Sequence, residues 1–212
     1  MRCATLSSVA CLLYRNQGKL KVMATVLDDT KRQAIASRLA TLKAIQNLII
    51  SNEQKLSSAV NDTEIRDRLQ DMLKDDQQNL QVIENCISKF GVSTQAPEKV
   101  QKLVETVQSL MEGNELTPYE KVFEHEKLKH QQAMTGLLVH KAAQVVGEDL
   151  EEAIGPLNKV NFENRAHQEQ LKGVLEVLST RELVGQDPDQ GVWGRVQDAV
   201  SALRGVFGSA AS

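Results

Sequence analysis

Apolar residues recur at intervals of three and four along most of the chain, the spacing that places them on one face of an α-helix. The pattern begins after candidate N-cap residues at Asp28, Asp29 and Thr30. It stops at turn signals, such as residues 61–64 and Gly147, and then resumes. The pattern therefore predicts helices over residues 28–60, 64–90, 97–112, 118–146, 148–183 and 193–207, with a break at Gly155-Pro156.

Composition supports a helical protein. Aromatic residues make up only 3% of the chain, and Leu, Val, Ala, Gln, Glu and Lys dominate it. The short turn at residues 61–64 predicts an antiparallel helical hairpin. We therefore expect an all-α fold, an antiparallel four-helix bundle with a short crossover helix and an appended C-terminal amphipathic helix. The expected organisation is a flexible extension at 1–27, a bundle domain at 28–183, and a linker with the C-terminal helix at 184–212.

The first 27 residues differ from the rest because they contain no Asp or Glu, but do contain Arg2, Arg15, Lys19 and Lys21. Such a segment is typical of an organelle transit peptide, or it is an upstream extension that precedes a normal start at Met23. No apolar run reaches the roughly 20 residues that span a bilayer. We expect a cytoplasmic protein.

Charge and cysteine content exclude several functional classes. The net charge of −3 and the scarcity of aromatic residues argue against a nucleic-acid binder. The three cysteines, Cys3, Cys11 and Cys86, are too few and too scattered for a disulfide framework or a zinc site. No glycine-rich phosphate loop and no catalytic triad pattern is present. The expected partners therefore exclude nucleic acid, and a membrane surface is disfavoured because the polar face of the C-terminal helix lacks a lysine belt.

Charged residues interrupt the apolar stripe of each long helix. Burying a charge is costly unless the charge is paired or bound to a metal. Two of the interruptions are Glu–His pairs separated by four residues, which place both side chains on one helix face. The candidate metal ligands are Glu126, His130, Glu163, His167, Asp76 and Glu53.

The levels of these residues favour a common site for most of them. His130 lies 17 residues before Gly147 and His167 lies 20 residues after it, so antiparallel helices bring them within one turn. Asp76 is near the middle of its own helix. Glu53 fits less well, because it lies about 9 Å from the level of Asp76. Carboxylates with histidines suit iron or manganese better than copper.

Carboxylates on two helices, with a Glu–His pair on each of the other two, resemble the ferritin-like di-iron bundles. The helix lengths and the late histidines also resemble the hemerythrin-like (HHE-type) proteins. This resemblance covers residues 28–183 and implies a di-iron centre, or a manganese one, that handles iron, oxygen or peroxide under oxidative stress. The spacing here is Glu-x-x-x-His, whereas ferritin-like sites use Glu-x-x-His.

Two readings remain open from the sequence. The first is the non-heme di-metal protein. The second is a metal-free helical bundle that binds a protein partner, or a second copy, through its C-terminal helix, in which case the Glu–His pairs are ordinary solvated residues. We expect the other two histidines, His125 and His140, to lie on the surface or in a satisfied interface.

Overall fold

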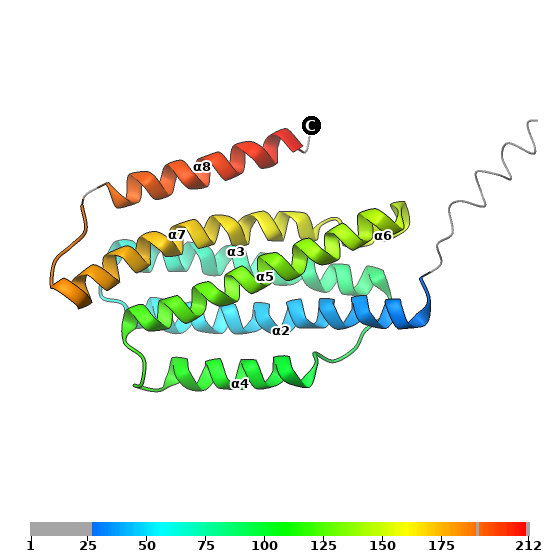
Figure 1. Cartoon of the computed structure of the whole chain (residues 1–212), viewed down its shortest axis with the longest axis horizontal. Coiled ribbons are helices and arrows are strands. Elements are labelled where there is room, and N and C mark those ends of the chain that lie inside the picture. The colour runs from blue at the N-terminus through cyan, green and yellow to red at the C-terminus, as the bar shows by residue number, and fades with distance from the viewer. Residues whose placement is uncertain (1–26, 190, 211–212) are drawn as a thin grey trace, which may run out of the picture.

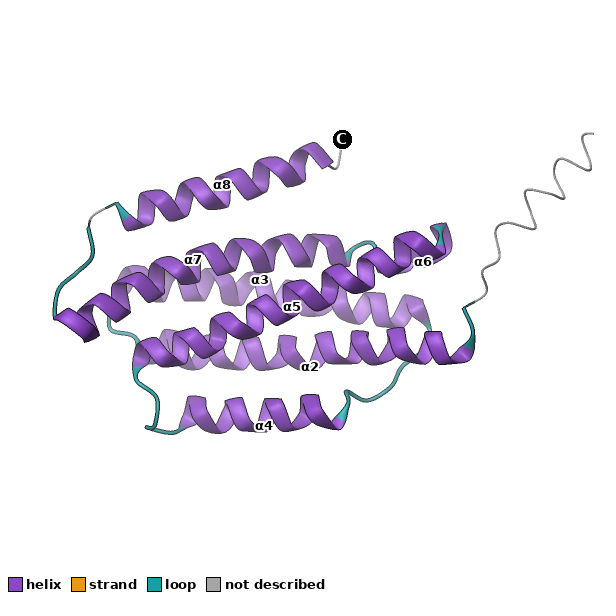
Figure 2. Cartoon of the chain, in the orientation of Figure 1, coloured by secondary structure: helices purple, strands orange, loops and turns teal. Residues whose placement is uncertain are grey.

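The computed structural model describes residues 27–189 and 191–210, and every regular element in this part of the chain is a helix (Figures 1 and 2). The predicted all-α class is therefore confirmed. The predicted extension at residues 1–27 lies almost wholly outside the described residues. The helices are α2 (Asp29–Ala59), α3 (Thr63–Phe90), α4 (Glu98–Glu112), α5 (Pro118–Val146), α6 (Glu148–Ile154), α7 (Leu157–Val184) and α8 (Val192–Ala210).

The four long helices enclose the core. Helix α2 packs against α3 and α5, and α7 packs against the same two helices from the other side. Helix α4 lies against α2 on the outside, and α8 lies along α7 (Figure 1). The side chains that form the core therefore come from helices far apart in the sequence.

Local signals set the ends of these helices. The Asp28 carboxylate accepts a hydrogen bond of 2.8 Å from the Lys31 amide at the start of α2. Thr117 and Glu120 form a reciprocal capping box at the start of α5. Gly91 ends α3 at a φ of 71°, a left-handed conformation that glycine adopts without a steric penalty. These boundaries agree closely with those expected from the sequence.

Buried polar residues separate the two large apolar clusters of the core. Along α3, Met72 belongs to one cluster and Ile83 to the other, with buried Asp76 between them. The same alternation occurs along α7, where buried His167 lies between Val160 and Leu171. The polar residues thus lie inside the protein, at a level with hydrophobic packing above and below.

Within the described residues, no helix combines the length and the apolar character needed to cross a membrane. The cytoplasmic placement stays a prediction. Cys86 is buried, as expected, and burial raises the pKa of its thiol to about 11.

Helix α8 docks on α7 at Gly173. A Cβ atom on Gly173 would lie 2.6 Å from Val196 Cγ2 and 2.8 Å from Trp193 Cζ3. We therefore expect Gly173→Ala to displace α8 and destabilise the protein by about 1–3 kcal/mol. Tryptophan emission measures this directly, because Trp193 is the only tryptophan. We expect a red shift.

The matched control is Gly194→Ala on α8 itself, where an added Cβ meets nothing within 4 Å. That change should leave the emission in place and slightly favour the helix. Unchanged emission in Gly173→Ala would contradict the observed docking.

Candidate functional site

A lysine lies at the centre of the buried polar residues. Lys129, on α5, is fully buried. Its Nζ lies 2.8 Å from Glu53 Oε1 and 3.0 Å from His167 Nδ1, and it donates to Asp76 Oδ2. These four residues, which we call the Lys129 cluster, come from α2, α3, α5 and α7. One ammonium therefore joins all four long helices.

Amide side chains complete the hydrogen bonding around Asp76. Gln46 Nε2 donates to Asp76 Oδ1 at 2.8 Å, and Asn79 Nδ2 donates to the same oxygen at 3.4 Å. Gln132 Nε2 in turn donates to Gln46 Oε1 at 2.9 Å. A carboxylate with an ammonium and two amide donors is well supported in its ionised form.

Opposite charges within the cluster offset part of the cost of burying them. Burial alone favours the neutral form of Asp76, but Lys129 and His167 outweigh it and hold the pKa of Asp76 well below its usual value. Burial disfavours the charged form of Lys129 too, yet Asp76 and Glu53 raise its pKa. Burial raises the pKa of Glu53 to about 8. At neutral pH the cluster therefore contains the Lys129–Asp76 ion pair and a protonated Glu53.

His125 lies beside the cluster as a neutral ring. Its Nε2 is 3.2 Å from Glu53 Oε1, and the side chain is fully buried. Burial, followed by the nearby Lys129 charge, lowers the pKa of His125 to about 3. The prediction that His125 lies on the surface or in an interface does not match this position in the core.

Glu53 gives a pH-dependent prediction. Burial raises its pKa from 4.5 to about 8, so between these values the folded protein retains a proton that the unfolded chain has lost. The free energy of unfolding should therefore fall as the pH rises through this window. We expect Glu53→Gln, which has no such proton, to remove a slope of up to about 1.4 kcal/mol per pH unit.

Urea unfolding of the wild type and Glu53→Gln at pH 6 and pH 8 measures this difference, because the other titrating groups are common to both proteins. The variant should gain stability relative to the wild type at the higher pH. Equal slopes in the two proteins would show that Glu53 is ionised throughout.

The cluster reaches the surface through His167. Its Nε2 lies 3.3 Å from Asp75 Oδ2, and the Asp75 side chain is 48% exposed. Burial and the Lys129 ammonium lower the pKa of His167, but Asp76 and Asp75 outweigh them and raise it. The Nδ1 atom is nearer to Lys129 Nζ, at 3.0 Å, than to Asp76 Oδ2, at 3.5 Å. These distances assign the tautomer of the neutral ring. Its Nδ1 accepts from Lys129, and its Nε2–H is directed at Asp75.

Asp75 and His167 line a cavity of about 290 Å³ between α3, α7 and α8. Two cationic side chains, Lys159 of α7 and Arg204 of α8, line the same cavity. Lys159 also pairs with Glu163 at 3.3 Å. The cavity thus combines a histidine–carboxylate pair with positive charge.

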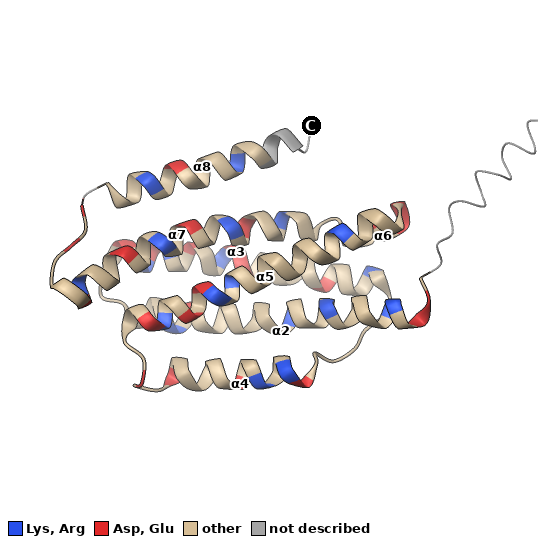
Figure 3. Cartoon of the chain, in the orientation of Figure 1, with Lys and Arg blue, Asp and Glu red and all other residues tan. Residues whose placement is uncertain are grey.

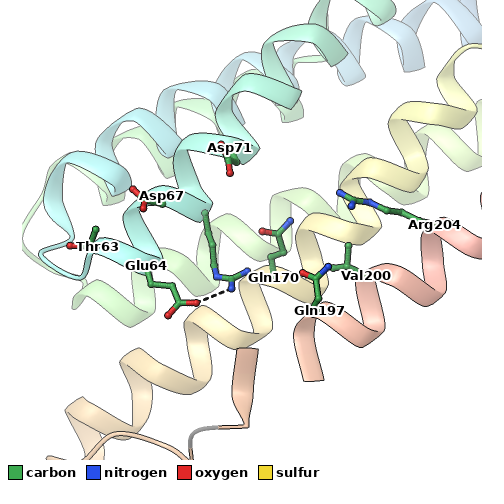
Figure 4. Close-up of a pocket in the computed structure, with 9 residues that line it drawn as sticks. Thr63, Glu64, Asp67, Asp71, Gln170, Gln197, Val200 and Arg204 are labelled. Carbon is green, nitrogen blue, oxygen red and sulfur yellow. Dashed lines mark hydrogen bonds and ion pairs between the residues drawn. The ribbon is translucent and has the colours of Figure 1, made fainter. Parts of the chain in front are cut away.

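A larger cavity of about 560 Å³ lies beside it and shares Gln170 and Arg204 (Figure 4). Its α3 wall carries Glu64, Asp67 and Asp71, with one cation, Arg68, which pairs with Glu64 at 2.9 Å. These carboxylates disfavour an anionic ligand, and the smaller cavity, with two carboxylates beside its two cations, is the better candidate of the two for an anion.

The structure brings three of the six expected ligands together. Ligand atoms of Glu53, Asp76 and His167 lie within 4.8 Å of one another. The other three are elsewhere. Glu126 accepts a hydrogen bond of 2.7 Å from Gln168, and exposed His130 lies 3.3 Å from the same amide nitrogen.

Glu163, the remaining expected ligand, is engaged with Lys159 at the cavity described above. The sequence predicted that His130 and His167 would lie in a common site inside the bundle. In the structure they do not face each other across the interior. His130 is exposed and His167 is 2% exposed. The expected Glu–His pairs do not form two halves of one centre.

The residues present do not fit a di-iron or dimanganese centre. The three clustered ligands are already arranged around the Lys129 ammonium, which supplies the positive charge. Two metal ions need more carboxylates than Glu53 and Asp76 offer. The other candidate ligands are directed to different partners.

Sequence reasoning missed Lys129 because it placed the buried face of α5 one residue out of register. Glu126 and His130 were expected on the buried face of this helix. The buried positions include instead Val122, His125, Lys129, Gln132 and Gly136. One residue corresponds to about 100° of rotation. One pattern in the sequence does indicate the buried position of Lys129. Val122, Gly136, Val139 and Ala143 recur at helical spacing and lie on the same face of α5 as the lysine.

We compared this all-helical protein with known proteins. No family model matches the chain, and no solved structure matches it. A protein from Nostoc sp. (strain PCC 7120 / SAG 25.82 / UTEX 2576), named "DNA nickase", is 56% identical over 188 residues, which is 89% of this chain and 54% of the relative. The chain therefore spans about half the length of that relative.

This finding overturns two expectations and leaves a third without support. The prediction of a protein that handles iron, oxygen or peroxide under oxidative stress is wrong, because the relative's name refers to DNA. The exclusion of nucleic acid as a partner is wrong for the same reason. The alternative of a metal-free interaction or scaffold protein has no support from the relative. Net charge averages over the whole chain, so it does not exclude a local contact with a phosphate.

Proposed function

We propose that this chain acts on DNA and breaks one strand of a duplex. The observation that carries the proposal is the 56% identity, over 89% of the chain, to the protein named a DNA nickase. The match covers 54% of that relative, so the activity of the whole relative is carried over here only as a proposal. We also propose that α2, α3, α5 and α7 form an antiparallel four-helix bundle that supports the site.

Strand cleavage has two chemical requirements. Positive charge must stabilise the phosphate as charge develops in the transition state, and an acid–base group must move a proton to or from the reacting oxygen atoms. Lys159 and Arg204 meet the first requirement in the smaller cavity, and Arg is well shaped for phosphate oxygens. Asp75 and His167 meet the second.

The geometry suggests separate roles for Asp75 and His167. Asp75 is half exposed and faces the cavity, where its carboxylate is positioned to accept a proton from an attacking water. His167 is buried behind it and directs Nε2–H at its Oδ2. Lys129 holds the opposite ring nitrogen. The buried cluster thus orients the pair from inside the core.

The charge distribution favours local rather than extended contact with DNA. Figure 3 shows Lys and Arg interspersed with Asp and Glu along the long helices, and no helix among the described residues is continuously basic. A protein of net charge −3 gains little from non-specific attraction to the phosphate backbone. We therefore expect weak binding to intact duplex and contact confined to a few phosphates at the cavity.

A plasmid assay tests the proposal. Supercoiled plasmid incubated with the full chain and Mg²⁺ should become open circular, with linear DNA appearing only later. The double change Lys159→Ala and Arg204→Ala should lower the rate at least tenfold, because it removes both cavity cations.

The matched control is the double change Lys99→Ala and Lys102→Ala on α4, which removes two exposed lysines from a helix remote from the cavity. Cleavage that is equal in all three proteins points to a contaminating nuclease and contradicts the proposed site. The absence of open circles with the wild type contradicts the proposed activity.

A further inference from the structure

The Lys129 cluster has the donor set of a metal site. Glu53 and Asp76 offer carboxylate oxygens and His167 offers a ring nitrogen, all within 4.8 Å of one another. Carboxylates with one imidazole suit a hard or borderline divalent cation. The donors come from three helices, and each residue is at most 2% exposed. Such a set is costly to bury without a cation at its centre.

A second observation also points to a cation. Glu53 Oε2 is buried and has no hydrogen-bond partner among the described residues. Its companion oxygen Oε1 is already directed at Lys129 Nζ, at 2.8 Å. A buried carboxyl group with one oxygen engaged and one unpartnered can give its second oxygen to a cation once it has lost its proton.

Lys129 Nζ lies among these donors. It is within hydrogen-bond distance of one atom from each of Glu53, Asp76 and His167. The ammonium has three N–H donors, and here it finds three acceptors. A divalent cation bound by the same three atoms would have to occupy nearly the same position.

We propose that the Lys129 ammonium occupies the cation position of a carboxylate–histidine metal site, so that the wild-type core excludes divalent metal and loss of the lysine side chain creates a metal site. Glu53, Asp76 and His167 are the ligands of that site. This inference does not depend on DNA cleavage.

Two variants at one position separate charge from space. Lys129→Ala removes both the charge and the side-chain volume, whereas Lys129→Met removes the charge but leaves a stem of similar length. Each purified full-length protein is titrated with Co²⁺ at pH 7.5, and its visible absorption and melting temperature are recorded. We expect about one Co²⁺ per chain in Lys129→Ala, with a rise in melting temperature of several degrees.

The controls use the same readouts. The wild type and Lys129→Met should show neither the absorption nor the rise in melting temperature. Adding His167→Ala to Lys129→Ala should reduce Co²⁺ affinity at least tenfold, because one ligand is lost. Exposed groups such as His130 are common to all of these proteins, so weak surface binding cancels in the comparison.

Several results would overturn the proposal. One is a folded Lys129→Ala, judged by its far-ultraviolet circular dichroism, that takes up no Co²⁺ at millimolar concentration. Another is uptake by the wild type that Asp76→Asn abolishes. If Lys129→Ala is unfolded without metal, refolding from urea in the presence of Co²⁺ should restore it. Failure to refold with Co²⁺, while Lys129→Met folds, also counts against the proposal.

Discussion

Asp76→Asn should destabilise the protein by about 3–5 kcal/mol, because it leaves the ammonium of Lys129 buried without its ionised partner. Both side chains are fully buried, and Lys129 Nζ donates directly to Asp76 Oδ2. The substitution preserves shape and removes the negative charge. The measurement is urea unfolding at pH 7 followed by circular dichroism.

Asp71→Asn is the matched control, five residues earlier on the same helix. Asp71 pairs with Lys74 at 2.8 Å, but both side chains are about 70% exposed. An exposed pair of this kind contributes about 0–1 kcal/mol. A loss below 1 kcal/mol in Asp76→Asn as well would show that the cluster carries no ionised pair.

Glu53 limits how much stability Asp76→Asn loses. In Asp76→Asn, Glu53 is the remaining carboxyl group beside Lys129 Nζ, at 2.8 Å. Its pKa of about 8 should fall once its acidic neighbour is gone, and its ionised form then replaces Asp76 as the partner of Lys129. The double variant Glu53→Gln and Asp76→Asn removes this substitute. It should therefore be less stable than the sum of the single changes indicates.

The accuracy of the sequence reading differs between helices for a physical reason. On α3 the apolar residues Ile65, Leu69, Met72 and Ile83 lie on one face, so Asp76 was correctly placed inside. On α5 apolar residues occur around the whole circumference, and Leu138 is 66% exposed. A stripe drawn through such a helix has no unique register, which is why Lys129 was overlooked.

Packing between helices determines which side of α5 faces inward, which the spacing of apolar residues does not. Gly136 faces α7 so closely that an added Cβ would lie 2.0 Å from Asn161 Oδ1. This contact fixes which side of α5 faces inward, and Lys129 shares that side. Such information belongs to the pair of helices and is absent from either sequence segment alone. The helix ends were predicted well because their caps are local.

The functional prediction failed for a different reason. Asp76 and His167 were correctly recognised as inward groups, but their purpose was assigned by resemblance to metal-binding bundles. Asp75, which joins His167 to the surface, is not on the apolar stripe and gave no signal in the sequence. The cavity that it lines also depends on Arg204 of α8, a helix whose docking position periodicity does not specify.

Asp75→Asn should lower the rate of plasmid nicking by about 10²- to 10⁴-fold, the usual contribution of a positioned acid–base group. Asp75 lies at the cavity wall with its side chain 48% exposed, so the Lys129 cluster behind it remains intact. Stability should therefore change by less than about 1 kcal/mol. This separates Asp75 from His167, whose replacement would disturb the core as well as the cavity.

The comparison is again with Asp71→Asn, which removes the same charge from the larger cavity. That variant should nick plasmid at the wild-type rate. The rates are measured from the disappearance of supercoiled DNA under single-turnover conditions, with urea unfolding of each protein alongside. If Asp75→Asn and Asp71→Asn nick equally fast, Asp75 takes no part in the reaction, and the smaller cavity is not the place where the strand is cut.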